Sequence, residues 1–136
     1  MANSAVGAKW AGCAPYLHSV LRIVAAFIFI LAGTTKLFAF PSAMPGGGTA
    51  HFPSQIWFGG VLETFGGLLM LLGLFTRPVA FVLAGEMAVA YFQFHFPASF
   101  WPTVNNGTSA ALYCFVWLYL SAAGAGPWSL DARRKK

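Results

Sequence analysis

Three ionisable side chains in this chain, Lys36, Glu63 and His95, could together bind a polar head group or pass protons. A lysine supplies hydrogen-bond donors, a carboxylate supplies acceptors, and a histidine gains and loses a proton near neutral pH. Glu63 is the only charged residue among the 20 residues from Ile56 to Phe75. Because a carboxylate is costly in an apolar environment, we expect Glu63 to be paired, protonated or turned toward a wet cavity.

The segments that must position these side chains are typical of a membrane protein. The chain is 58% hydrophobic and 8% charged, whereas a soluble domain averages about 25% charged residues. Only helices of roughly 20 apolar residues satisfy their own backbone across a bilayer. The sequence therefore predicts one all-α integral membrane domain over residues 1–136, a four-transmembrane-helix bundle with helices near Ser19–Phe40, Gln55–Phe75, Val79–Phe96 and Ser109–Gly124.

The basic residues lie on one side of this predicted bundle. Lys9, Arg77 and the basic tail 131–136 share that side, and the other two loops contain no lysine or arginine. The positive-inside rule then predicts cytoplasmic N and C termini, in a multi-pass protein of a bacterial-type inner (plasma) membrane. Four of the eight basic residues end the chain, so the formal charge of +5 indicates contact with membrane lipid and no nucleic acid partner.

The first apolar segment has a second interpretation, as a secretory signal peptide. Ile23–Gly33 has the length of a signal's apolar core, and Arg22 precedes it. However, Lys36 follows it, and no clear small-x-small cleavage site stands beyond it. We therefore expect this segment to be a retained membrane helix.

Glycines indicate how the segment that carries Glu63 packs. Gly59, Gly66 and Gly73 recur every seven residues, with Glu63 four residues after the first and three before the second. Residues at these spacings share a helix face, and glycines allow another backbone to approach closely. We expect these three glycines to pack this face, with its carboxylate, against protein.

Depth along the helices predicts two polar clusters. At about 1.5 Å per residue, Lys36 can reach Glu63 in the outer half of the membrane, where His95 also lies. This outer cluster could hydrogen-bond a quinone head group or relay protons, or it could be a purely structural pairing. A second cluster is expected at the cytoplasmic side, as structural ion pairs among Arg22, Arg77, Glu86 and Asp131.

No pattern for a metal site or for independent catalysis is present. The sequence has no C-x-x-C, no H-x-x-x-H and no phosphate-binding loop. His51 and His95 could face the same outer compartment, but a loop histidine is usually only solvated. We therefore expect no metal site, and we assign no catalytic residue to this chain alone.

Several segments follow one another in the order and at the spacing of a known family. They are LRIVAAFIFILAGTTKL at 21–37, VLETFGGLLMLLGLFTRPVA at 61–80, His95, the Asn-Asn-Gly of 105–107 and GAGPWSLD at 124–131. Together they resemble the DoxX family, over roughly residues 18–131. The resemblance implies a small four-helix membrane protein with motif positions at Arg22, Lys36, Glu63, Gly66, Arg77, His95, Gly126, Pro127 and Asp131.

The family also implies a functional context. Its namesake is a subunit associated with a quinone-linked sulfur oxidoreductase, and some relatives are linked to oxidative-stress and thiol-redox complexes. The resemblance therefore implies an accessory subunit of a membrane redox complex, with other membrane subunits as partners and quinone as the cofactor. The alternative is a non-enzymatic scaffold, or a membrane protein that binds a lipid or small molecule, in which the buried ion pairs are purely structural.

Overall fold

The structure is a computed structural model that describes residues 2–135, and within them the chain is helical, with no strand. Two π-helical segments, η1 (Leu62–Gly66) and η2 (Tyr91–His95), join α3 to α4 and extend α5. Lys136, the last residue of the expected basic tail, lies outside the described residues. The α-helices are α1 (Ala2–Ala11), α2 (Ala14–Phe38), α3 (Gln55–Val61), α4 (Gly67–Leu72), α5 (Thr76–Ala90), α6 (Thr108–Ala123) and α7 (Leu130–Arg134).

The four apolar segments predicted to be helices are helical in the structure. Two of them are long and apolar enough to cross a membrane, α2 and the continuous helix Gln55–Leu72, and α6 is a shorter apolar helix. The helix Gln55–Leu72 begins where expected because the Ser54 hydroxyl accepts the amide N–H of Trp57 at 3.1 Å, which caps the first turn. The largest shift is at α2, which begins at Ala14 rather than Ser19.

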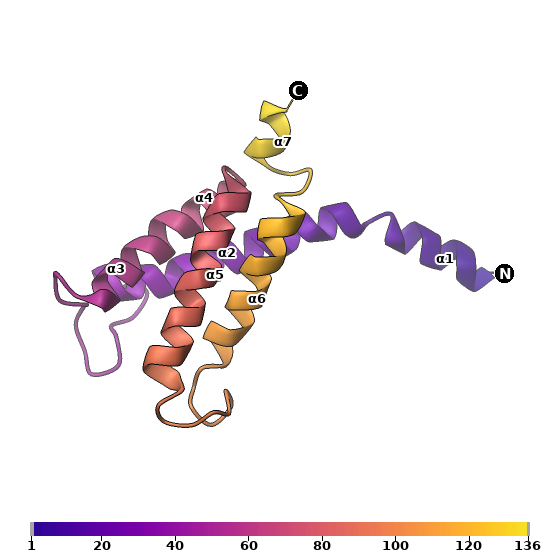
Figure 1. Cartoon of the computed structure of the whole chain (residues 1–136). Helices are drawn as coiled ribbons and strands as arrows, with labels where there is room; N and C mark the ends of the chain where they lie inside the picture. Colours follow the sequence, from indigo (N-terminus) through magenta and orange to yellow (C-terminus); the bar gives the residue numbers. More distant parts are fainter. Residues whose placement is uncertain (1, 136) are drawn as a thin grey trace.

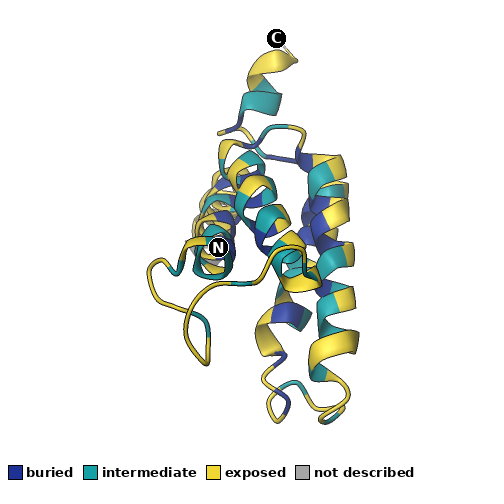
Figure 2. Ribbon diagram, turned by 90° about the vertical axis from the view of Figure 1, so that its left-hand side faces the viewer, coloured by how far each residue is buried: buried dark blue, intermediate teal, exposed yellow. Residues whose placement is uncertain are grey.

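The helices pack as two pairs around one core. Helix α2 lies against α3, η1 and α4, while α5 lies along α6, and α1 projects away from the rest (Figure 1). Phe29, Met70, Leu83 and Trp117 contribute fully buried side chains from four different helices. Exposed residues cover the outward faces (Figure 2), and they include many large apolar side chains. An apolar outer surface of this extent indicates contact with a membrane or with other proteins.

The second helix approaches α2 through small residues. A Cβ atom on Gly60 would lie 3.0 Å from Cβ of Lys36, and one on Gly67 would lie 2.7 Å from Cγ1 of Ile30. Contacts this short leave no room for a larger residue. The close approach brings the last turn of α2 directly over η1.

Two of the three glycines expected to share one packing face do share it. An added Cβ on Gly66 would lie 2.8 Å from Leu83, and one on Gly59 would lie 3.4 Å from Oε1 of Glu86, and both of these neighbours are on α5. Gly73 does not share this face, because it lies beyond the end of α4 in a left-handed conformation with φ of 64°, which ends the helix.

Arg22 binds the backbone at the end of the molecule where α4 and α6 end. Its side chain is fully buried, and it donates to the carbonyls of Ala125 at 2.8 Å, Leu71 at 2.7 Å, Trp128 at 2.5 Å and Met70. Two of these carbonyls belong to the last turn of α4, where the helix carries partial negative charge, and the Met70 carbonyl also accepts the amide N–H of Gly73 at 3.2 Å. The guanidinium therefore ties α2, α4 and the segment after α6 together.

The ion pairs predicted at this end do not form among residues 2–135. Arg77, like Arg22, donates to backbone carbonyls, here those of Ser121 and Ala122 near the end of α6. Helix ends offer unpaired carbonyls, so each guanidinium finds partners without a carboxylate. The predicted ion-pair cluster was therefore wrong for all of its members, Arg22, Arg77, Glu86 and Asp131.

Asp131 instead caps the start of α5. Its carboxylate accepts the amide N–H groups of Phe75 and Thr76, each at 2.9 Å, and its own amide donates to the Gly73 carbonyl at 2.9 Å. Burial acts to raise the pKa of Asp131, but the hydrogen bonds from Thr76 and Phe75 and the charge of Arg134 outweigh it, so the pKa is lowered. These bonds fix α7 to the turn between α4 and α5.

We predict that Arg22→Lys lowers the free energy of unfolding by roughly 3 kcal/mol. An ammonium cannot reach all four carbonyls, and each lost bond to a charged donor leaves a buried carbonyl unpaired. Thermal unfolding in detergent micelles measures the effect. Arg133→Lys, on an exposed residue of α7, is the matched control and should melt with the wild type. Equal melting temperatures for all three proteins would contradict the role given to Arg22.

We predict that the stability difference between the wild type and Asp131→Asn is present at pH 7 and is lost in acid. A lowered folded-state pKa stabilises the fold above the unfolded-state pKa. That stabilisation falls as the pH drops through 3.8, the ordinary aspartate value, toward the lower folded value. Unfolding midpoints of both proteins, measured from pH 7 downward, test this. A gap of constant size at every pH would show that the carboxylate charge is not the cause.

Candidate functional site

A cavity of about 600 Å³ lies at the other end of α2 from Arg22, bordered by α2, α3, η1, α5 and η2. Its volume is in the range of small-molecule binding sites, about 300–1,000 Å³. Most of the lining is apolar, and it includes the rings of Phe58 and Phe94. The ionisable groups that line it are Lys36, Glu63, Glu86 and His95.

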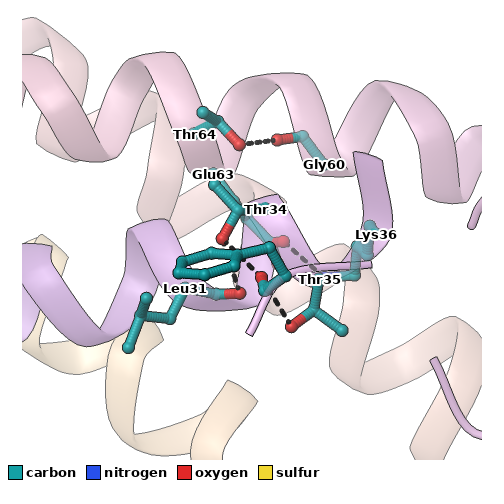
Figure 3. Close-up of polar contacts among 8 residues, drawn as sticks. Leu31, Thr34, Thr35, Lys36, Gly60, Glu63 and Thr64 are labelled. Atoms are coloured by element: carbon teal, nitrogen blue, oxygen red, sulfur yellow. Dashed lines mark hydrogen bonds and ion pairs between the residues drawn. The ribbon is translucent and has the colours of Figure 1, made fainter. Parts of the chain in front are cut away.

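The ammonium group of Lys36 pairs with Oε2 of Glu63 at this cavity. Lys36 lies in the last turn of α2 and Glu63 lies in η1, so the pair joins the first two helical segments (Figure 3). The Glu63 side chain is 5% exposed and that of Lys36 is 26% exposed. The pairing predicted from helix depth is therefore present, and it is the one ion pair that occurs within residues 2–135.

Glu63 and His95 each lie in a π-helical segment, Glu63 in η1 and His95 in η2. In η1 the Thr64 hydroxyl donates to the Gly60 carbonyl at 2.8 Å (Figure 3). Single π turns inside α-helices occur frequently at functional sites. The sequence was interpreted as regular helix at both places, because apolar periodicity does not reveal one inserted residue.

The ring of His95 is held by the loop that follows η2. Its Nδ1 lies 3.0 Å from the carbonyl oxygen of Asn105. A carbonyl can only accept, so Nδ1 carries the proton in this bond and Nε2 remains for another partner. Asn105 is itself buried and fixed by the Ser99 carbonyl and the Gly107 amide, each at 2.7 Å. Sequence reasoning named Asn105 only in the Asn-Asn-Gly stretch of the family resemblance and missed this positioning role.

Glu86 lies at this cavity and not at the Arg22 end where it was predicted. Helix α5 begins at Thr76 rather than Val79, which places Glu86 about 15 Å along the continuous helix formed by α5 and η2, near its middle. Glu63 and Lys36 line the same cavity. Oε2 of Glu86 is buried and has no hydrogen-bond partner among the described residues. The signal that could have found it is the one that identified Glu63, a lone acid in an apolar segment.

The site therefore offers one ammonium, two carboxyl groups and one imidazole beside an apolar space. The side-chain amide of Gln55, which also lines the cavity, donates to Gln93 and connects α3 to η2. No group of three or more His, Cys, Asp or Glu side chains in residues 2–135 is arranged to hold a metal ion. The arrangement can bind a molecule with an apolar ring and polar substituents, and it can exchange protons with that molecule.

Comparisons with known proteins place the chain in a family. Residues 17–96, more than half of the chain, match the DoxX family model. A protein from Haemophilus influenzae described as uncharacterized is 45% identical over 120 residues, which cover 86% of this chain and 90% of that protein. No solved structure matches the chain.

We predict that Lys36 and Glu63 are energetically coupled by about 1–3 kcal/mol. Lys36→Met or Glu63→Gln alone leaves the other group without its partner in a largely buried place, whereas the double variant removes both. Unfolding free energies of the four proteins in detergent give the coupling. Lys36→Met combined with Arg133→Lys serves as the control, because the two sites are distant and their effects should add. Additive effects for Lys36 and Glu63 as well would show that the contact has no energetic role.

Proposed function

The chain belongs to the DoxX family of membrane-associated proteins, and on this premise we propose that it is an accessory integral-membrane subunit of a quinone-linked redox complex. In this proposal the four long helical segments cross a bacterial inner membrane, with both termini in the cytoplasm. The apolar length of α2 and Gln55–Leu72 and the exposed apolar side chains support the membrane location. The basic residues Arg77, Arg133, Arg134 and Lys135 support the orientation.

The observation that carries the proposal is the cavity with its ionisable groups. A quinone head group needs a flat apolar space and hydrogen-bond donors near its carbonyl oxygens. Phe58 and Phe94 border the space, and Lys36 is a donor at its wall. Nε2 of His95, whose Nδ1 proton goes to the Asn105 carbonyl, is an acceptor for a quinol hydroxyl. The pairing of Lys36 with Glu63 keeps the ammonium group at the cavity wall.

The proposed role is accessory because the oxidation or reduction of a quinone needs a group that carries electrons. The side chains of residues 2–135 form no group that could hold a metal. In the proposal, a metal centre or flavin on another subunit exchanges electrons with the quinone. This chain binds the head group and supplies protons to it.

A scaffold function is the second candidate, and one observation favours it. Arg22, Arg77 and Lys36 all make contacts that join helices, and such contacts stabilise a bundle whether or not it binds a ligand. In a scaffold, the exposed apolar faces contact partner subunits or lipid, and the cavity has no specific occupant.

Substitutions at two glycines, Gly59 and Gly85, distinguish the two candidate functions. We predict that Gly59→Leu lowers the quinone that co-purifies from native membranes by about tenfold or more, because the new side chain enters the cavity. Gly85→Leu is the matched control, since a Cβ there meets nothing within 4 Å and the residue does not line the cavity. Solvent extraction and mass spectrometry quantify the quinone against the protein.

The two candidates give opposite results in this experiment. Quinone in the wild type and Gly85→Leu, and its loss in Gly59→Leu, supports the redox subunit. A wild type that retains its partner subunits and contains no quinone would overturn the redox proposal and favour the scaffold.

A further inference from the structure

The charges at the cavity do not balance. Lys36 on α2 is already paired with Glu63 on η1, and Glu86 on α5 forms no ion pair with any residue from 2 to 135. His95 on η2 is the remaining titratable group that faces the cavity, and its Nδ1 is bonded to Asn105. With every carboxyl group ionised, two negative charges would face one ammonium group in a largely apolar space.

Glu86 is also the carboxyl group without a hydrogen-bond partner. Its Oε2 is buried and unpartnered in the part of the chain that the structure describes, whereas Glu63 accepts from Lys36. Across from Oε1 lies Gly59, whose missing side chain leaves that oxygen beside open space. Buried polar atoms in folded proteins almost always have partners, so a water or a bound molecule must hydrogen-bond Glu86.

We propose, resting on the proposed function, that Glu86 is the carboxyl group that hydrogen-bonds the head group in both redox forms, protonated beside the quinone and ionised beside the quinol, while Glu63 holds Lys36 in place. A quinone ring has carbonyl acceptors, so it bonds to the protonated acid, whose O–H donates. The reduced quinol has hydroxyl donors, so it bonds to the ionised carboxylate, which accepts. The same residue thus binds both forms of the ring, in opposite protonation states, and the proposal concerns binding without electron transfer.

The proposal predicts a pH dependence of opposite sign for the two forms. As the pH rises, Glu86 loses its proton, so quinone affinity falls and quinol affinity rises. We expect the ratio of the two dissociation constants to change by about tenfold or more between about pH 6 and about pH 9. The measurement is anaerobic titration of the purified full chain in detergent with decylubiquinone and with its reduced form.

Four variants locate the proton. Glu86→Gln should bind both forms with a ratio that no longer depends on pH, because an amide both donates and accepts. Glu86→Asp should keep the dependence, and Glu86→Met should lose affinity for both forms by about tenfold. His95→Asn keeps a donor for the Asn105 carbonyl and should leave the dependence in place. Because Glu86 has no partner to lose, at least one of its variants is expected to fold, and melting temperatures verify this.

The outcomes distinguish this inference from the proposed function. A pH dependence that persists in Glu86→Gln, or that disappears in His95→Asn, would overturn the inference and leave quinone binding standing. A wild type that binds neither form at any pH would overturn both. Loss of the dependence in Glu86→Gln together with its retention in Glu86→Asp and His95→Asn supports the inference.

Discussion

The buried guanidinium of Arg22 is the interaction on which the rest of the structure depends. It joins α2 to the last turn of α4 and to the segment after α6, so it fixes how far α2 is shifted along its neighbours. Lys36 lies about 21 Å along α2 from Arg22, whereas Glu63 lies only about 10 Å along the second helix from Met70. The long side chains of Arg22 and Lys36 cover the difference between these two distances. The position of the ammonium group at the cavity is therefore set at the opposite end of the helix.

The two ends of the molecule use charge in different ways. At the Arg22 end, cations bind the carbonyls at helix C-termini and Asp131 binds amides at a helix N-terminus, so helix ends replace side-chain partners. At the cavity, Lys36 pairs with Glu63, and His95 bonds to a loop carbonyl. Glu86 is left with a buried oxygen that has no partner among the described residues. Charged groups at the cavity are therefore less completely paired than those at the Arg22 end.

Sequence reasoning predicted the helices and one of the two polar clusters. Apolar length located the four helical segments, and rise per residue was enough to pair Lys36 with Glu63, because both lie on well-defined helices. The partners of Arg22 could not be predicted, since backbone carbonyls are the same for every residue type. Glu86 was misplaced because the start of α5 depends on a cap from Asp131, which is distant in sequence. The π turns and the bond from His95 to Asn105 also depend on tertiary contacts that no local pattern reveals.

An apolar layer separates the two ends. Phe29 lies seven residues from both Arg22 and Lys36 on α2, and its buried ring lies 5.2 Å from that of Trp117, with Leu83 also buried in this layer. None of the side chains named in this layer is charged, so they offer no titratable group between the cavity and the Arg22 end. Under the proposed function, protons at the cavity would therefore be exchanged on one side of the bilayer, and this subunit would carry no charge across it.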